Sequence, residues 1–268
     1  MVNHVLITGA SQGAGKATAL RFAQGGWDVT LAARNRERLD TVAHTIQAMG
    51  RQALAIPTDV GDAQQVTQLI EKALDTYGRL DALINNAGIC LTGPAVNTSL
   101  DDCHQILDTN LLVCIHTIQA LLPAMLAQGS GTIINVGSFG GKMPLPQMTA
   151  YCTSKYALTG LTESLRIELA SEGIHVGIVH PGVINSDFLE RAMFRGKSDQ
   201  EASERQQQMQ QTLQSSWVSQ PEDIAEAVWK AVKQQQADVV VGPVAIATEL
   251  NRLFPQLTQW ALASRRPR

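Results

Sequence analysis

Ser138, Tyr151 and Lys155 are the residues of this chain whose types and spacing most directly suggest chemistry. A tyrosine and a lysine four positions apart lie on the same face of a helix. A free phenol has a pKa of about 10, and a nearby ammonium group lowers that pKa. A phenol adjusted in this way can act as a general acid or base near neutral pH. By itself such a pair is common on exposed helices, so the interpretation depends on the rest of the chain.

A glycine-rich segment near the N-terminus provides the context for redox chemistry. It reads Thr8-Gly9-Ala10-Ser11-Gln12-Gly13-Ala14-Gly15 and lies between an expected strand and an expected helix, which is the context that a dinucleotide-binding loop requires. Gly9 would allow the tight turn, Gly13 a close approach to pyrophosphate, and Gly15 close packing of helix on strand. The first N–H groups of the helix would then face phosphate. An ordinary glycine-rich turn is the alternative interpretation.

Short runs rich in β-branched residues alternate with longer amphipathic stretches along the chain. The expected strands are Val2–Thr8, Asp28–Ala33, Gln52–Pro57, Ala82–Asn85, Thr132–Val136, His175–His180 and Asp238–Val241. The expected helices are Gly13–Gln24, Arg36–Met49, Ala63–Tyr77, Ser99–Ala127, Ala150–Ser171 and Pro221–Gln234. This alternation predicts an α/β fold over residues 1–242. We expect a single doubly wound Rossmann-type domain with a seven-stranded, mostly parallel sheet flanked by helices.

Two regions interrupt this alternation. Residues 186–216 begin with an apolar patch and continue as a glutamine-rich stretch, and we expect them to form a substrate lid. Residues 243–268 form a C-terminal tail that mixes apolar residues with a basic end. The tail suits an interfacial membrane helix interrupted by Pro255. Packing on a neighbouring subunit or on the substrate pocket is an alternative with at least equal support.

The overall composition limits the classes of function. The chain has 268 residues, a net charge of -3 and a pI of about 6.1, so it lacks the basic footprint of a nucleic-acid partner. Its four cysteines show no CxxC spacing, so we expect no metal site and no disulfide framework, and reduced thiols in a cytoplasmic protein are the simplest interpretation. The N-terminus has no signal-peptide pattern, and we expect no apolar run that approaches the roughly 18–20 residues of a transmembrane helix.

Several motifs together make the chain similar to the short-chain dehydrogenase/reductase family over roughly residues 2–242. The glycines at positions 9, 13 and 15 give the pattern TGxxxGxG, which differs from GxGxxG. Asn85-Asn86-Ala87-Gly88 follows the fourth expected strand, Ser138 the fifth and Pro181-Gly182 the sixth. Tyr151 and Lys155 complete the resemblance. It implies the fold, a nicotinamide cofactor and chemistry between carbonyls and alcohols, but not the substrate.

The resemblance also implies catalytic roles. Tyr151 would exchange a proton with the substrate oxygen, and Ser138 would hold that oxygen by a hydrogen bond. Lys155 would lower the pKa of the phenol and bind the ribose next to the nicotinamide. Asn110 would support a water molecule that relays protons to Lys155, although a buried, hydrogen-bonded amide is the alternative for Asn110 alone.

Further positions would contact the cofactor by the same resemblance. Asp59 would hold the adenine amino group and Val60 would pack on its ring, while a helix cap is an almost equally supported interpretation of Asp59. The remaining expected cofactor contacts are Ser11, Gln12, Ala14, Asn86, Ala87, Gly88, Pro181, Gly182, Ile184 and Ser186. The family usually has threonine where Ser186 stands. His180 and Cys152 are interpreted as a strand-end residue and a packing residue.

Arg34 follows the second expected strand, where an acidic residue would accept hydrogen bonds from a ribose 2′-hydroxyl and favour NAD. No acid is present there, and a guanidinium matches the 2′-phosphate of NADP in charge and geometry. Ser11 would be a second donor. Arg34 and Arg36 would be poorly placed as ordinary surface charges, because cations oppose the dipole at a helix N-terminus. The sequence therefore favours NADP(H).

The substrate side is less sharply defined. The expected pocket residues are apolar and predict a lipophilic ketone, aldehyde or 3-oxoacyl substrate, although core or lid packing explains them equally well. They are Leu91, Phe139, Met143, Leu145, Phe188, Leu189, Met193 and Phe194. An NAD-dependent hydroxysteroid- or polyol-type dehydrogenase is the second hypothesis, and a non-catalytic NADP-sensing or scaffold protein is the third. The resemblance implies a homodimer or homotetramer formed through the two longest helices.

Overall fold

A computed structural model describes residues 2–184, 190–215 and 218–264 of the chain. Seven strands form one sheet in the order β3-β2-β1-β4-β6-β7-β9, and every neighbouring pair is parallel. Their bounds are β1 His4–Thr8, β2 Asp28–Ala33, β3 Ala53–Pro57, β4 Ala82–Asn85, β6 Gly131–Val136, β7 Ile174–Pro181 and β9 Asp238–Val241. The expected doubly wound Rossmann-type fold is confirmed, and the sheet is fully rather than mostly parallel.

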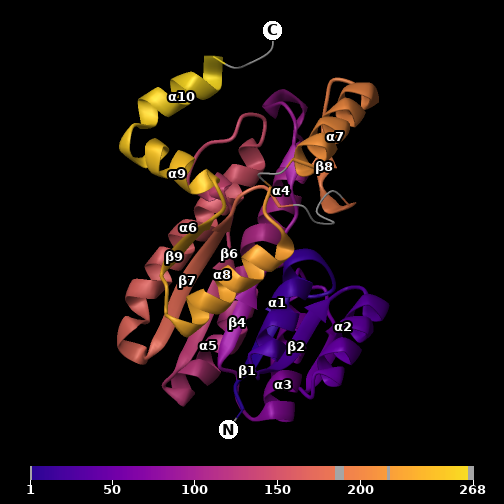
Figure 1. Ribbon diagram of the computed structural model, residues 1–268, viewed down its shortest axis with the longest axis vertical. Helices are drawn as coiled ribbons and strands as arrows, with labels where there is room; N and C mark the ends of the chain where they lie inside the picture. The colour runs from indigo at the N-terminus through magenta and orange to yellow at the C-terminus, as the bar shows by residue number, and fades with distance from the viewer. Residues whose placement is uncertain (1, 185–189, 216–217, 265–268) are drawn as a thin grey trace.

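Helices cover both faces of the sheet (Figure 1). The helices are α1 Gly13–Gln24, α2 Arg36–Ala48, α3 Ala63–Tyr77, α4 Leu100–Leu107, α5 Val113–Gln128, α6 Thr149–Glu168, α7 Asp199–Leu213 and α8 Pro221–Lys233. Alternate residues of each buried strand face opposite cores. In β1, Val5 and Ile7 pack with residues of α1, α2 and α8. Leu6 instead packs with residues of α3 and α5. The near-continuous apolar strands in the sequence therefore reflect burial on both sides.

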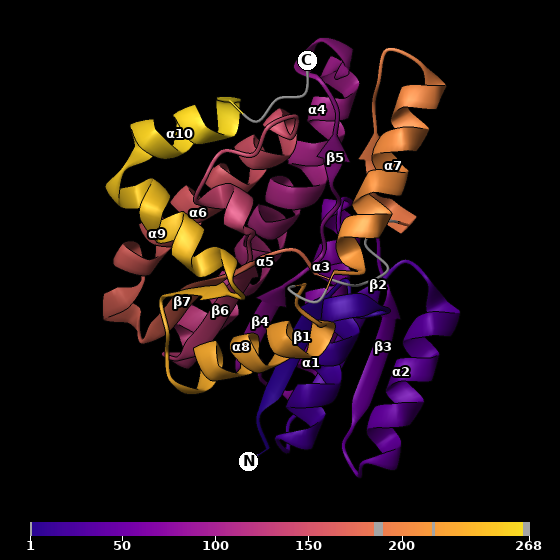
Figure 2. The same ribbon diagram turned by 45° about the horizontal axis from the view of Figure 1, so that its top comes forward.

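The carboxyl ends of the strands lie at one edge of the sheet, and the chain order reverses between β1 and β4. This switch point is where open α/β sheets bind their ligands. Two additions lie beyond this edge. A two-stranded parallel pair joins β5 (Leu91–Thr92) to β8 (Met193–Phe194), and α7 follows it. The tail forms α9 (Val244–Leu253) and α10 (Pro255–Ser264), which lie beside α6 and apart from α7 (Figure 2).

The expected helix over 99–127 is a continuous helical segment with an irregular centre. A π-helical turn, η2 (Asp108–Leu112), separates α4 from α5. The segment Leu100–Gln128 is long and apolar enough, by length and composition, to cross a membrane. The expectation that no apolar run approaches that length was therefore wrong. Ile118, Leu121 and Met125 of this segment pack in the core under the sheet, so core packing accounts for part of its hydropathy.

Candidate active site

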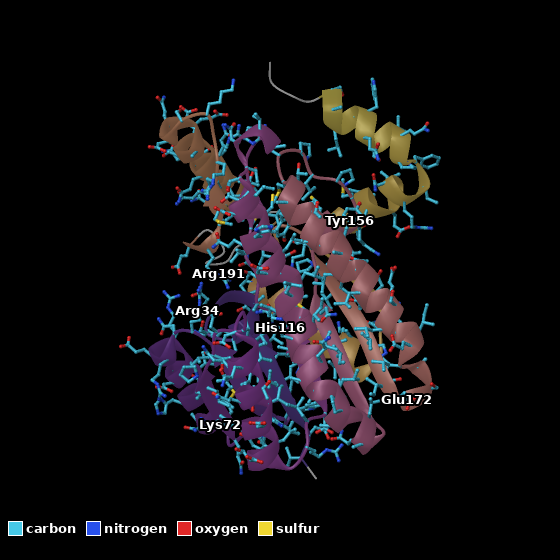
Figure 3. The ribbon with its side chains drawn as sticks, turned by 180° about the vertical axis from the view of Figure 1, so that it is seen from behind. Arg34, Lys72, His116, Tyr156, Glu172 and Arg191 are labelled. Carbon is cyan, nitrogen blue, oxygen red and sulfur yellow. The ribbon has the colours of Figure 1, made fainter. Side chains whose placement is uncertain are left out.

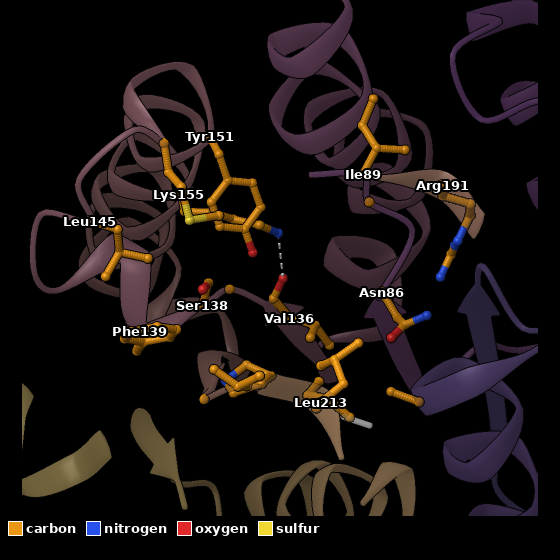
Figure 4. Close-up of a pocket in the computed structure, with 18 of the residues that line it drawn as sticks. Asn86, Ile89, Val136, Ser138, Phe139, Leu145, Tyr151, Lys155, Arg191 and Leu213 are labelled. Atoms are coloured by element: carbon orange, nitrogen blue, oxygen red, sulfur yellow. Dashed lines mark hydrogen bonds between the residues drawn. The ribbon is translucent and has the colours of Figure 1, made fainter. Parts of the chain in front are cut away.

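Ser138, Tyr151 and Lys155 meet at the carboxyl edge of the sheet (Figure 4). Ser138 follows β6, and its hydroxyl accepts a hydrogen bond from the amide of Gly140 at 3.1 Å. Tyr151 and Lys155 come from the first turns of α6 and are 7% and 5% exposed. Their four-residue spacing places both side chains on the face of α6 that looks toward Ser138. The structure thus brings together three residues that are separated in sequence.

Lys155 is held by the backbone of the neighbouring strand. Its Nζ donates a hydrogen bond to the carbonyl oxygen of Val136 at 3.0 Å, and it lies 6.0 Å from the centre of the Tyr151 ring. Burial lowers the pKa of the Lys155 ammonium. The sequence did not indicate Val136, because a backbone carbonyl leaves no residue-type signal.

The pKa of Tyr151 moves in the direction opposite to the one expected. Burial raises the pKa of the phenol above its ordinary value, and the hydrogen bond with Ser138 opposes that rise. The lowering of the Tyr151 pKa that was expected from the ammonium of Lys155 is therefore not seen, because loss of solvation outweighs a charge 6.0 Å from the ring. Among the described residues, Ser138 is the one whose hydrogen bond lowers the pKa of Tyr151.

Asn110 lies in the π-helical turn η2 and is completely buried. Its side-chain oxygen accepts from the amide of Ile89 at 2.9 Å, and its side-chain nitrogen donates to the carbonyl of Ile89 and to the hydroxyl of Ser154, both at 3.0 Å. The Asn110 amide thus ties η2 to the segment after β4 and to α6. This geometry matches the structural alternative, and the proton-relay role stays a prediction.

The glycine loop is joined to the segment after β4. The side chain of Asn86 donates to the carbonyl of Thr8 at 3.0 Å. The hydroxyl of Thr8 accepts from the amides of Asn86 and Ala87 at 3.0 and 3.1 Å. Ala87 and Asn86 therefore fix the loop geometry. A side chain at Gly15 would place its Cβ 2.2 Å from the carbonyl oxygen of Gly9, which explains the third glycine.

This loop fits a dinucleotide phosphate. Gly9 and Gly13 both have positive φ, at 65° and 53°, a conformation that glycine adopts without strain. Within the described residues, no side chain caps α1, whereas Asn35 caps α2 and Asp62 caps α3. The first amides of α1 are therefore directed at the pocket without a side-chain acceptor, which suits an anion.

The adenosine end of the expected site is open. Arg34 is exposed at the end of β2 (Figure 3) and makes no hydrogen bond or ion pair within the described part of the chain. Asp59 is exposed, and its carboxylate accepts from the amide of Gly61 at 3.0 Å. Asp62 caps the following helix instead, so the interpretation of Asp59 as a helix cap was wrong. Val60 is half-buried beside it.

One cavity of about 150 Å³ lies between the glycine loop and the three polar residues. Its lining includes eleven of the positions expected from the sequence, namely Gln12, Ala14, Gly15, Asn86, Gly88, Ser138, Tyr151, Lys155, Pro181, Gly182 and Ile184. Gly9, Ala87, Arg34, Asp59, Val60 and Asn110 do not line it, and Ser11 and Gly13 face a neighbouring surface cleft. Ser186 lies outside the described residues.

The apolar wall of the cavity differs from the expected one. Phe139 and Leu145 line it as expected, and Met148, Met209 and Leu213 complete it. Leu91 and Met193 instead pack with Ile106 and Ala150 in a small core. Met143 and Phe194 do not line the cavity either. The alternative interpretation, core packing, therefore holds for Leu91 and Met193. Phe188 and Leu189 lie outside the described residues. Residues 186–216 were expected to form a lid, but Met209 and Leu213 were not singled out, because they are spaced among glutamines.

The start of the segment that leads to α7 is bound to α4 by an ion pair. Arg195 donates to both carboxylate oxygens of Asp102, at 3.0 and 2.6 Å. These bonds, chiefly, lower the pKa of Asp102 to about 2. The amides of Met193 and Arg195 also donate to the carbonyls of Cys90 and Thr92. Strand β8 therefore fixes the start of the segment that carries α7 over the cavity.

His180 is a contributor that its sequence position did not reveal. It lies in β7, as a strand residue should, and is fully buried. Its Nδ1 is 2.9 Å from the carbonyl oxygen of Ser138, and its Nε2 is 3.7 Å from a carboxylate oxygen of Asp238. Burial lowers the pKa of His180 to about 4, so the ring is neutral near pH 7. His180 therefore supports the backbone of Ser138 without facing the cavity.

Comparisons with known proteins agree with this geometry. The family model described as short chain dehydrogenase matches residues 3–195. The chain belongs to the short-chain dehydrogenase family. Among curated relatives, a ketoacyl reductase of Nostoc is 33% identical over 250 residues, which cover 93% of this chain and 82% of that protein.

Two solved structures show which cofactors related proteins bind. A 3-ketoacyl-acyl-carrier-protein reductase from Brucella melitensis, in complex with NADH, has a TM-score of 0.78 and 27% identity, and covers 90% of this chain and 96% of its own. A variant of actinorhodin polyketide ketoreductase with NADPH has a TM-score of 0.77 and 26% identity, and covers 90% of this chain and 95% of its own. This short-chain dehydrogenase is therefore an oxidoreductase that acts on CH–OH or C=O groups, and its structural neighbours include complexes with NADH and with NADPH.

Proposed function

We propose that this short-chain dehydrogenase is an NADPH-dependent reductase of lipophilic carbonyl compounds, such as ketones, aldehydes or 3-oxoacyl groups. One observation carries the proposal. Ser138, Tyr151 and Lys155 converge in an apolar cavity whose other side is the glycine loop and the uncapped end of α1. A proton donor and a dinucleotide site thus share one enclosed space.

When bound, the reduced nicotinamide supplies a hydride to the carbonyl carbon. Tyr151 transfers its phenolic proton to the carbonyl oxygen, which completes the alcohol. Ser138 holds that oxygen beside the phenol and stabilises the negative charge of the phenolate that remains. Lys155 adds a positive charge and binds the ribose hydroxyls, and Asn110 belongs to the route by which Tyr151 regains a proton. In the reverse direction the phenolate acts as the base.

The substrate class follows from the wall opposite Tyr151. Phe139 and Leu145 precede α6, and Met209 and Leu213 come from the end of α7. These side chains exclude water from the reacting oxygen and offer an apolar surface to an acyl chain or ring. The ketoacyl and polyketide reductases among the relatives are consistent with such a substrate.

Activity is the direct test. The purified protein should oxidise NADPH in the presence of some members of a panel of ketones, aldehydes and 3-oxoacyl thioesters. Tyr151→Phe should reduce kcat by at least about 100-fold, because it removes the general acid, and should leave the Kd for NADPH unchanged. Tyr156→Phe is the matched control, since Tyr156 lies on the same helix and is 42% exposed. NADPH binding without turnover on the whole panel would favour a non-catalytic role and contradict the proposal.

Cofactor choice is tested separately at Arg34. Loss of a charge-assisted bond to the 2′-phosphate costs about 1.5–3 kcal/mol, so Arg34→Ala should weaken NADPH binding by roughly 10- to 150-fold. Binding of NADH should change little. Arg36→Ala is the control, because Arg36 is also exposed and lies two positions further along the chain. An unchanged ratio of the two Kd values would favour the NAD-dependent dehydrogenase hypothesis.

A homodimer or homotetramer formed through α4–α5 and α6 remains a prediction. Leu112 and Leu126 are about 40% exposed on the long helical segment, and Ile167 is 81% exposed on α6. Sedimentation velocity of the wild type and of Leu112→Gln would show whether these helices associate. A monomer at micromolar concentration would contradict the prediction.

A further inference from the structure

The tail helix α9 buries polar side chains and exposes large apolar ones. Thr248 and Asn251 are buried on α9. Asn251 donates to the carbonyl of Lys142 at 3.1 Å and accepts from the hydroxyl of Thr258 at 2.8 Å. These polar contacts dock the tail on the loop after Ser138. The usual amphipathic pattern of a surface helix is therefore inverted.

The tail exposes several large apolar side chains that are close together in the sequence. The described part of the chain has fourteen exposed large apolar residues, and six of them lie in the tail between positions 246 and 260. These six residues, which together we call the tail surface, are Ile246, Leu250, Leu253, Phe254, Leu257 and Trp260. Leu257 and Trp260 are 61% and 68% exposed. Single exposed apolar residues are ordinary, whereas a contiguous group marks an interaction surface.

The charge of the tail differs in sign from that of the rest of the chain. Residues 243–268 contain four arginines and one glutamate, whereas the whole chain has a net charge of -3. The single acid, Glu249, is paired with Arg252 at 2.9 Å. A basic segment with exposed leucines and a tryptophan has the composition that binds the interface of an anionic membrane.

The tail also lies beside the mouth of the catalytic cavity. A surface cleft separates Leu145 and its neighbouring prolines from Gln259, Leu262 and Ala263 of α10. Leu145 lines the catalytic cavity as well. Leu145 is therefore common to the cleft beside α10 and to the wall of the catalytic cavity, which places the tail close to the expected substrate side.

We propose that the tail surface binds the interface of an anionic lipid bilayer and holds the cavity mouth against it. The step to substrate delivery rests on the proposed carbonyl reductase function, but membrane binding does not. Trp260 and the leucines enter the boundary between headgroups and acyl chains, and the net positive charge of residues 243–268 favours anionic lipids.

Co-sedimentation of the full chain with vesicles tests the proposal. The wild type should bind vesicles of phosphatidylcholine mixed with phosphatidylserine more tightly than vesicles of phosphatidylcholine alone, and added salt should weaken the binding. The double variant Leu257→Gln/Trp260→Gln should reduce the partition coefficient about tenfold. Val96→Gln is the matched control, because Val96 is 85% exposed but lies outside the tail, and its binding should equal that of the wild type.

The same variants separate this proposal from the proposed function. Reduction of a water-soluble ketone by NADPH should be unchanged in Leu257→Gln/Trp260→Gln, whereas reduction of a carbonyl dissolved in the vesicles should fall with binding. Wild-type protein that remains in the supernatant with both vesicle types would overturn the proposal. So would a wild-type oligomer that the double variant dissociates, because a second copy would then cover the tail surface. Vesicle binding without any turnover would contradict the reductase function alone.

Discussion

The ion pair between Arg195 and Asp102 allows a quantitative test of the expected lid function of the segment that carries α7. We expect Arg195→Ala to release the start of the segment that leads to α7. Asp102 is almost fully buried, whereas the side chain of Arg195 is 39% exposed. The pKa of Asp102 falls from its ordinary 3.8 to about 2, which corresponds to roughly 2 kcal/mol.

Only part of that free energy belongs to the ion pair. The bonds between Ser99 and Asp102 also lower the pKa of Asp102 and persist in the variant, and solvent screens the exposed guanidinium. We therefore assign about 1–1.5 kcal/mol to Arg195, which is roughly a tenfold change in an equilibrium constant. Because the carboxylate has a depressed pKa, this stabilisation is present above pH 4 and is lost only as the pH falls toward 2. The contribution of the ion pair to stability is therefore constant at any pH above 4.

Steady-state kinetics measure the consequence. If α7 must cover the cavity for the carbonyl to bind, KM for the carbonyl should rise up to about tenfold in Arg195→Ala, while the Kd for NADPH stays the same. Lys230→Ala is the control, because its pair with Glu226 is exposed and 3.5 Å long, so its removal should have no measurable effect. A variant that loses stability in urea but retains its KM would refute the reasoning, since the pair would then be structural only.

Three further predictions follow from close contacts and buried histidines. Gly15→Ala should destabilise the protein by about 3 kcal/mol or more in urea unfolding, because the added Cβ would collide with backbone atoms. Gly160→Ala is the control, because Gly160 faces open space on α6, and it should stabilise the protein by up to about 1 kcal/mol. Equal effects of the two substitutions would contradict the packing argument. His180→Leu should lower kcat roughly tenfold by releasing Ser138 without changing the Kd for NADPH, and an unchanged kcat would show that Ser138 needs no such support. Burial lowers the pKa values of His4, His175 and His180, so below pH 6.5 the unfolded chain binds more protons than the folded one. The free energy of unfolding should therefore be constant above pH 6.5 and should decrease at lower pH, by up to about 1.4 kcal/mol per pH unit for each histidine. Constant stability from pH 7 to 5 would contradict this prediction.

The strands and helices of the main domain were predictable because local pattern and tertiary burial agree. The bounds of Asp28–Ala33 and Ala82–Asn85 were predicted to the residue, since strands buried on both faces are predominantly apolar. Gly50 and Gly78 follow α2 and α3 and have positive φ, which is how helices commonly end. Such signals lie within a few residues of the feature that they determine.

Features that depend on distant partners were not predictable. Strands β5 and β8 have two residues each and exist only because Leu91–Thr92 and Met193–Phe194 meet across the fold. The π-helical turn at Asp108–Leu112 lies in a segment with ordinary helical composition. Helix α7 could not be recognised from the sequence, because its many exposed glutamines leave little apolar periodicity. In each case the deciding contact is absent from the local sequence.

The candidate site shows the same division. Ser138, Tyr151 and Lys155 were predictable, because their side chains carry the chemistry. The groups that hold them were not, since they are backbone atoms or buried polar side chains, such as the carbonyl of Val136 under Lys155 and the ring of His180 under Ser138. The pKa of Tyr151 was misjudged for the same reason, because burial is a property of the packed fold.

The two sides of the cavity are lined by different kinds of residue, and this difference indicates which side determines substrate specificity. The cofactor side consists of glycines and of Asn86, which bonds to the carbonyls of Thr8 and Gly9. A Cβ at Gly15 would collide with backbone there, so few substitutions are tolerated. The substrate side includes Phe139 together with leucine and methionine side chains such as Met148 and Met209, and the methionines in particular can be replaced at little cost. Substitutions in that wall should therefore alter which carbonyl is accepted while leaving the binding of the nicotinamide cofactor intact.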